Sequence, residues 1–131
     1  MIGEAFGVKA PVKTHSPTLY VEVQLEREGR LPLPDHIEER VVYVVSCRAQ
    51  INGTPLTQHK MAIFHQNPGI ELEATEPCRL VIIGGTNLGK RTVWWNQVSS
   101  RKDLIEQAKQ DWQDQKFPKV SGETEFIPLP E

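Results

Sequence analysis

The chain has 131 residues, with Lys+Arg 15 against Asp+Glu 17, a formal net charge of −2 and 38% hydrophobic residues. This length and composition predict one ordinary globular domain with a hydrophobic core of its own. The near-neutral charge argues against a nucleic-acid-binding surface, which depends on a basic excess to displace counterions from phosphates.

The sequence also bounds the compartment. Its first ten residues carry no basic segment ahead of an apolar one, so they predict no secretory signal. The longest apolar run, residues 41–45, is far shorter than the ~20 residues that cross a bilayer. We therefore expect a cytoplasmic protein without membrane contact. Cys47 and Cys78 form no CxxC motif, and a reducing cytosol would leave them as buried free thiols.

The first two thirds of the chain predict strands. Residues 18–25 alternate apolar and polar side chains, as in a strand with one buried face. Residues 40–46, RVVYVVS, are β-branched and apolar on both faces, as in a strand covered on both sides. Asn52-Gly53 predicts a hairpin turn. Further short strands are expected at residues 56–57, 61–65, 70–74 and 80–84. A spacing of about 8–12 residues indicates a sandwich or barrel.

The last third predicts one helix and an extended tail. Ser99 or Ser100 can cap a helix whose first turn holds Asp103, and Pro118 ends it. The apolar stripe of this helix comprises Leu104, Ile105, Ala108 and Trp112. Residues 123–131, ETEFIPLPE, carry enough apolar side chains that we expect the tail to pack on its own barrel or on a partner.

Three long strings carry a family resemblance. They are LPDHIEERVVYVVSCRAQING at residues 33–53, LVIIGGTNLGKRTVWW at 80–95, and the helix and tail at 99–131. The Gly84-Gly85 turn, the WWN string followed by two serines, and the closing FIPLP are the specific parts. Over essentially the whole chain, the sequence resembles the cupin superfamily and, within it, the C-terminal domain of pirin-like proteins.

This resemblance implies an all-β fold: a single antiparallel β-barrel of jelly-roll type with one C-terminal α-helix. Residues 1–131 would form one cupin domain, with the barrel at about 15–98, the helix at about 100–116 and the tail at 117–131. Full-length pirin-like proteins have two such barrels, of which the N-terminal one binds iron. The chain resembles the other barrel alone.

The resemblance also allows a test for a metal site. Catalytic cupins follow the pattern G-x5-H-x-H-x3,4-E-x6-G, in which imidazoles and a carboxylate converge on a divalent ion. Counted from Gly29, the two His positions fall at Asp35 and Ile37, and the Glu position falls at or near Val41. The first motif is therefore degenerate.

Other ligand sets are no better. In the second cupin motif, the expected His position falls near Glu71 and Leu72. His59 and His65 would lie about 20 Å apart if they shared one strand, too far for a single ion. A further possible set does not converge on one ion, because consecutive strand side chains point to opposite faces: Asp35, His36, Glu38 and Glu39. We expect no metal, no cofactor and no catalytic residue.

The remaining expectations concern binding. The barrel interior would be the small-molecule pocket, with His36, Tyr43, His65 and Glu71 near it. Interface residues would be Trp94, Trp95, Gln97 and Phe126. Gln97 stands where the family usually has an aromatic residue, and Cys47 stands where it has a glycine, which predicts a strained turn.

The missing half of the two-barrel arrangement would leave an apolar face exposed, so we expect a homodimer that covers it. The predicted function is a metal-free, non-catalytic cupin module that binds a small molecule or a protein. Two alternatives are a metal-dependent dioxygenase, as quercetin dioxygenase activity has been associated with pirin-like proteins, and a subunit that pairs with a separate metal-binding barrel.

Overall fold

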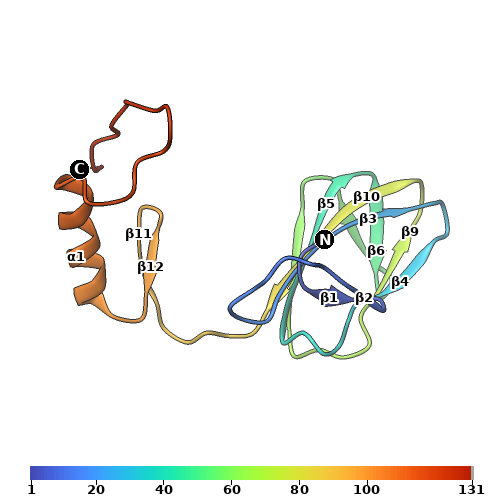
Figure 1. The fold of residues 1–131 in the computed structure, drawn as a ribbon. Coiled ribbons are helices and arrows are strands. Elements are labelled where there is room, and N and C mark those ends of the chain that lie inside the picture. The colour runs from blue at the N-terminus through green and yellow to red at the C-terminus, as the bar shows by residue number, and fades with distance from the viewer. Residues whose placement is uncertain (131) are drawn as a thin grey trace. The chain divides into compact units, whose positions relative to one another are not determined.

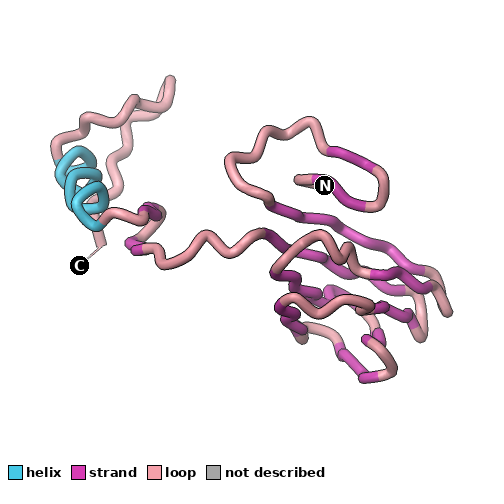
Figure 2. Tube along the Cα trace, turned by 90° about the horizontal axis from the view of Figure 1, so that it is seen from below, coloured by secondary structure: helices cyan, strands magenta, loops and turns pink. Residues whose placement is uncertain are grey.

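The computed structural model describes residues 1–130 and is mostly β. The chain divides into two compact units, Met1–Asn87 and Leu88–Glu131. Strands make up most of the regular structure of the first unit, whereas the helix lies in the second (Figure 1, Figure 2). No helix within the described part of the chain has the length and apolar character needed to span a bilayer.

The first unit contains two four-stranded antiparallel sheets. The front sheet has the order β3-β10-β5-β8, and the back sheet has the order β4-β9-β6-β7. A two-stranded hairpin, β1-β2, precedes them. The bounds are β1 Glu4–Ala5, β2 Val8–Lys9, β3 Thr18–Leu25, β4 Arg30–Pro32, β5 Glu39–Ser46, β6 Arg48–Ile51, β7 Thr54–Thr57, β8 Met61–His65, β9 Glu71–Ala74 and β10 Cys78–Gly85.

The two sheets face each other (Figure 1), and the hydrophobic core takes its side chains from both. Alternate residues of β3 are buried and exposed, which confirms the period of two expected at residues 18–25. Fully buried side chains come from both sheets: Leu19, Val42, Val44, Leu80 and Ile82 from the front, and Leu72 from the back. Each such side chain contributes roughly 1.5–3 kcal/mol through burial, so this interior is what holds the unit together.

Strand positions follow the sequence pattern closely, but the sheets differ from a single barrel. The strands expected at residues 18–25 and 61–65 have the bounds predicted for them. Hydrogen bonding divides the strands between two large sheets, instead of running around one closed sheet. The last strand of the two four-stranded sheets, β10, ends at Gly85.

The turn between β6 and β7 confirms the hairpin prediction. Asn52 and Gly53 both adopt positive φ, 46° and 79°. Positive φ at both central residues is what a two-residue turn of the type matched to the twist of β-strands requires, and Asn-Gly adopts it readily.

The expectation of two free thiols was wrong, because Cys47 and Cys78 form a disulfide with Cα atoms 5.2 Å apart. Cys47 directly follows β5 and Cys78 begins β10, and these two strands pair. The pairing brings together cysteines separated by 31 positions, within the Cα–Cα range that a disulfide spans. Cys47 has a φ of 107°, so the strained turn expected where the family has glycine is confirmed.

The second unit consists of a hairpin and a helix: β11 Thr92–Trp94, β12 Gln97–Ser99 and α1 Lys102–Gln113. The predicted cap was wrong, since Arg101 is the N-cap residue and no side chain caps the helix. The strand continues through Ser99, whose Oγ accepts a hydrogen bond from the Arg101 N–H at 3.1 Å. Asp103 lies in the first turn, as expected, where the positive end of the helix dipole stabilises its carboxylate.

The tail packs on its own helix. Phe126 stacks on Trp112 with ring centroids 6.1 Å apart, and the Trp112 Nε1–H donates to the Ile127 carbonyl oxygen at 2.8 Å. The Trp95 ring meets Trp112 edge-on at 5.1 Å. Ile105 is nevertheless the one side chain of this unit that is buried among its described residues. The unit therefore has aromatic contacts but almost no interior.

Candidate functional site

A buried arginine occupies the inner face of the front sheet at one end of β5. The side chain of Arg40 is 1% exposed. Its Nη1 donates to Asp35 Oδ1 at 2.8 Å, and its Nη2 donates to the Asn67 carbonyl oxygen. The Gly69 N–H donates to the same Asp35 carboxylate at 3.3 Å. The hydrogen bond from Arg40, followed by that from Gly69, lowers the pKa of Asp35 below its usual range.

These contacts bear on the metal site that the cupin pattern implies. Asp35, which occupies the first His position of the pattern, forms an ion pair with the Arg40 guanidinium. That positive charge would repel a metal ion. Ile37, at the second, is a core residue. Residues 1–130 contain no cluster of three or more His, Cys, Asp or Glu side chains that could hold a metal ion. The residues present do not fit a cupin metal centre.

The structure does not bring the four predicted ligand-binding residues together. Tyr43 and His65 lie on the outer face of the front sheet, where the Tyr43 hydroxyl is 3.2 Å from His59 Nδ1 and His65 Nδ1 is 3.6 Å from a Glu39 oxygen. Glu71 belongs to the back sheet. Its carboxylate is 3.4 Å from Arg30 Nη1, so it takes part in a surface ion pair.

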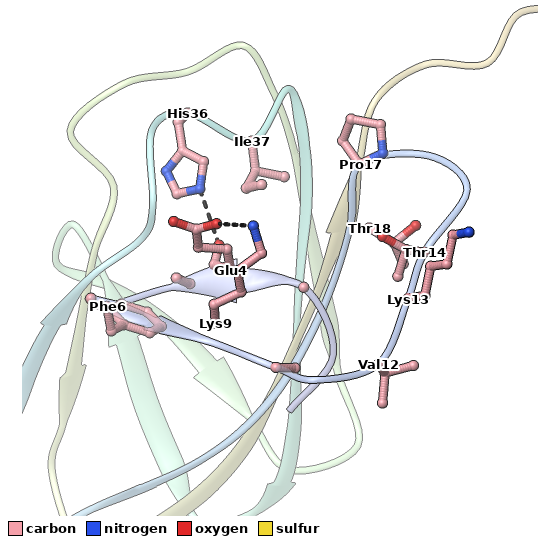
Figure 3. Close-up of a pocket in the computed structure, with 14 residues that line it drawn as sticks. Glu4, Phe6, Lys9, Val12, Lys13, Thr14, Pro17, Thr18, His36 and Ile37 are labelled. Atoms are coloured by element: carbon pink, nitrogen blue, oxygen red, sulfur yellow. Dashed lines mark hydrogen bonds and ion pairs between the residues drawn. The ribbon is translucent and has the colours of Figure 1, made fainter.

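The fourth residue, His36, lines a pocket under the N-terminal segment. His36 Nε2 lies 3.1 Å from the Glu4 carbonyl oxygen, and the Glu4 carboxylate pairs with Lys9 Nζ at 3.2 Å. Figure 3 shows these three side chains gathered at one side of the pocket. The pocket has a volume of about 730 Å³. Its other walls include Phe6, Val12, Lys13, Pro17 and Ile37. This size suits a small organic molecule.

Three of the four predicted interface residues are aromatic and gather in the second unit. Trp94 and Trp95 meet edge-on at 6.3 Å, and the Lys109 ammonium lies 4.6 Å from the centre of the Trp94 ring. Phe126 joins this group through Trp112. Gln97 lies opposite Trp94 in the hairpin, with its Oε1 buried and without a hydrogen-bond partner among the described residues.

Sequence reasoning missed two features of the first unit. The β1-β2 hairpin was not expected, because its strands are too short for a periodic pattern. Arg40 was included in an apolar strand without a role. Because valines occupy both faces of β5, the sequence does not show which face Arg40 joins. In the structure Arg40 is buried, and Asp35, five positions earlier, is the acidic partner that a buried charge needs.

Comparisons with known proteins agree with these observations. A family model described as the pirin C-terminal cupin domain matches residues 20–118. A pirin-like protein of Caulobacter vibrioides is 40% identical over 98% of the chain, which covers 45% of that relative. A pirin-like protein of Solanum lycopersicum is 27% identical over 86% of the chain and 41% of its own length.

A solved structure described as quercetin 2,3-dioxygenase from Acinetobacter baumannii has a TM-score of 0.80 at 24% identity, covering 99% of this chain and 46% of that one. At this identity the likeness supports the fold alone. The chain spans about half the length of the relatives it matches. With its paired sheets, its C-terminal helix and a family match over most of its residues, the chain belongs to the pirin C-terminal cupin domain family.

Proposed function

We propose that the chain is a non-catalytic, metal-free cupin module that self-associates. The observation that carries this proposal is the apolar surface that the first unit leaves exposed on the outside of its front sheet. Ile63 is 59% exposed, Met61 53% and Ile83 41%. Apolar surface on this scale is typical of proteins that bury it against a partner.

The length of the relatives supports a second copy as that partner. The relatives have roughly twice the length of this chain, so each contains a further segment large enough for another domain. Two copies of the chain related by a two-fold axis would restore an arrangement of two cupin domains. Closed two-fold dimers are also the commonest assemblies of identical chains.

Light scattering during size-exclusion chromatography tests the proposal. We expect a mass that approaches twice 14.9 kDa at concentrations well above the micromolar range, with dissociation on dilution. A mass of one chain under these conditions would refute self-association. Co-purification with a separate cupin chain from the native cell, in place of a second copy, would instead support the subunit alternative.

The enzymatic alternative is a metal-dependent dioxygenase that acts on quercetin, the substrate named for the Acinetobacter structure. The pairing of Asp35 with Arg40, described above, disfavours this alternative. We expect elemental analysis of untagged protein to find no stoichiometric iron or copper. We also expect no loss of quercetin absorbance when the protein is incubated with Fe²⁺ in air. Stoichiometric metal together with quercetin turnover would overturn the non-catalytic proposal.

The pocket at His36 is our candidate for small-molecule binding. Its walls combine apolar side chains with the ammonium groups of Lys9 and Lys13, an arrangement suited to a planar apolar molecule with acidic hydroxyls. Quercetin is the probe, and isothermal titration calorimetry measures its binding. We expect Phe6→Ala to weaken its binding and Val98→Ala, outside the pocket, to leave it unchanged. Equal affinity of both variants and the native chain would exclude this pocket.

We propose a cytoplasmic location, which the Cys47–Cys78 disulfide makes testable. Disulfides are rare in the reducing cytosol unless they are redox-active. Rapid acid quenching of cells followed by thiol alkylation would show whether both cysteines are reduced there. Full oxidation in the cell would contradict a cytoplasmic location.

A further inference from the structure

The front sheet has an apolar outer face. The sequence of β5 is apolar on both sides, a pattern expected of a strand covered on both faces. Arg40, Val42 and Val44 point into the core, whereas Val41 and Tyr43 alternate with them and are half-buried on the outside. The outer side of β5 is therefore apolar, although the core packs only against its inner side.

The strand register aligns these outer residues in two rows across the sheet. In the first row, Ile83 pairs with Tyr20 on one side and Val41 on the other, and Val41 pairs with Ile63. In the second row, Val81 pairs with Glu22 and Tyr43, and Tyr43 pairs with Met61. We call the apolar members of both rows the front face: Tyr20, Val41, Tyr43, Met61, Ile63, Val81 and Ile83.

The front face is exposed. Met61 is 53% exposed, Tyr20 42% and Ile83 41%. Side chains within a row are neighbours because adjacent strands lie about 4.8 Å apart, so the two rows form one continuous patch. Polar residues flank it: Arg79 Nε lies 2.8 Å from a Glu22 oxygen towards one end of the strands, and Glu39 lies at the other end beside His65.

We propose that the front face is the dimer interface and that it packs against the front face of a second copy. The two-fold axis would lie in the plane of the interface, perpendicular to the strands and midway between the two rows. This inference rests on the self-association proposed above and names the surface responsible. The two sheets would pack face to face with their strands aligned, as the sheets of β-sandwiches do at a distance of about 10 Å.

Charge and shape complementarity favour a second copy as the occupant. The axis places each row over the other row of the partner, so Ile83 meets the partner's Val81 and Ile63 meets the partner's Met61. At the β3 edge, the Tyr20 hydroxyl can donate to the partner's Glu22. Arg79 lies over the partner's Gly85, which pairs in register with Glu39, so guanidinium and carboxylate approach each other. The face is thus complementary to itself.

The size of the face sets the expected affinity. Four strands about 4.8 Å apart and eight residues of about 3.3 Å each span at most about 19 Å by 26 Å, or about 500 Å² per copy. Two copies would bury at most about 1,000 Å², less than the roughly 1,200–2,000 Å² of standard interfaces and in the range of weak, transient ones. A dimer of this size is expected to dissociate in the micromolar range.

Sedimentation velocity over a dilution series tests the interface. We expect Ile63→Lys and Ile83→Lys to weaken dimerisation by roughly 100-fold or more, since both place an unpaired charge within an apolar contact. Val8→Lys is the matched control, because Val8 is 57% exposed but lies outside the front face, and it should dimerise like the native chain. Circular dichroism of each variant verifies that it is folded.

A charge reversal gives a second test that does not depend on apolar residues. Glu39→Arg should weaken the dimer, because it places a cation against the partner's Arg79. A native chain that is monomeric would refute both the interface and self-association. A dimeric native chain that stays dimeric with Ile63→Lys and Ile83→Lys would refute the interface and leave self-association standing. A Glu39→Arg chain that dimerises like the native chain would refute the proposed orientation of the two copies.

Discussion

Reduction of the Cys47–Cys78 disulfide is expected to lower the stability of the first unit more than any other mild perturbation. The bridge joins the end of β5 to the start of β10, where the two strands leave regular register between Arg79 and Leu80. Cys78 is 5% exposed, so reduction with both cysteines retained removes the covalent link without emptying the core. This makes reduction a cleaner perturbation than substitution.

The loop that the bridge closes sets the magnitude. With a sequence separation of 31, the chain-entropy relation gives a loss of about 12 cal/mol/K from the unfolded ensemble. At 25 °C this corresponds to about 3.7 kcal/mol of stability that reduction would remove. For a chain of this size, we expect the melting temperature to fall by roughly 10–20 °C.

Urea denaturation with and without a phosphine reductant measures this difference. We expect a lower midpoint for the reduced protein. The variant carrying both Cys47→Ser and Cys78→Ser should unfold at the same midpoint in either condition. Titration of thiols in the unfolded, non-reduced chain should find none. Two titratable thiols per chain, or equal midpoints for the oxidised and reduced native chain, would refute the reasoning.

Three further substitutions test contacts described above. The pKa of Asp35 is lowered in the folded chain, so the Asp35 carboxylate contributes its full stability above its unfolded pKa of about 4. That contribution is lost as pH falls through the folded pKa. The difference in urea midpoint between the native chain and Asp35→Asn should therefore be largest near pH 7 and shrink in acid. Trp112→Phe keeps an aromatic ring but removes the donor to the Ile127 carbonyl, which should cost about 0.5–1.5 kcal/mol and speed proteolytic cleavage of the tail. Gly84→Ala should lower the stability measured in urea by about 1–3 kcal/mol, because its Cβ would lie 2.7 Å from both the Glu39 backbone carbonyl oxygen and Ile37 Cγ2.

The strands were predictable because their residues carry local information. The alternation of residues 18–25 and the Asn52-Gly53 turn depend only on neighbours in the sequence. The disulfide depends on how β5 pairs with β10 across 31 positions, which local sequence patterns do not reveal. The prediction of free thiols relied instead on an assumed cytosolic location. The helix start was displaced because the hairpin that precedes it extends through Ser99.

The candidate site was less predictable than the fold. Placing Tyr43 and His65 in the barrel interior required knowing which face of each strand points inward. In β5 the branched, apolar pattern on both faces gives no such signal, and Arg40 holds the inward position that a polarity rule would assign to solvent. His36 reaches a pocket because the unexpected β1-β2 hairpin lies over it.

The three positions that correspond to the first metal-ligand motif each serve a structural purpose in this chain. Asp35 neutralises the buried guanidinium of Arg40, and replacing it by a metal-binding histidine would leave that charge unpaired inside the protein. Ile37 is 7% exposed and packs in the core, where an imidazole would need a polar partner. Val41 lies in the middle of the front face. Building a metal centre at these positions would therefore require giving up a buried ion pair, a core residue and part of the proposed dimer interface together.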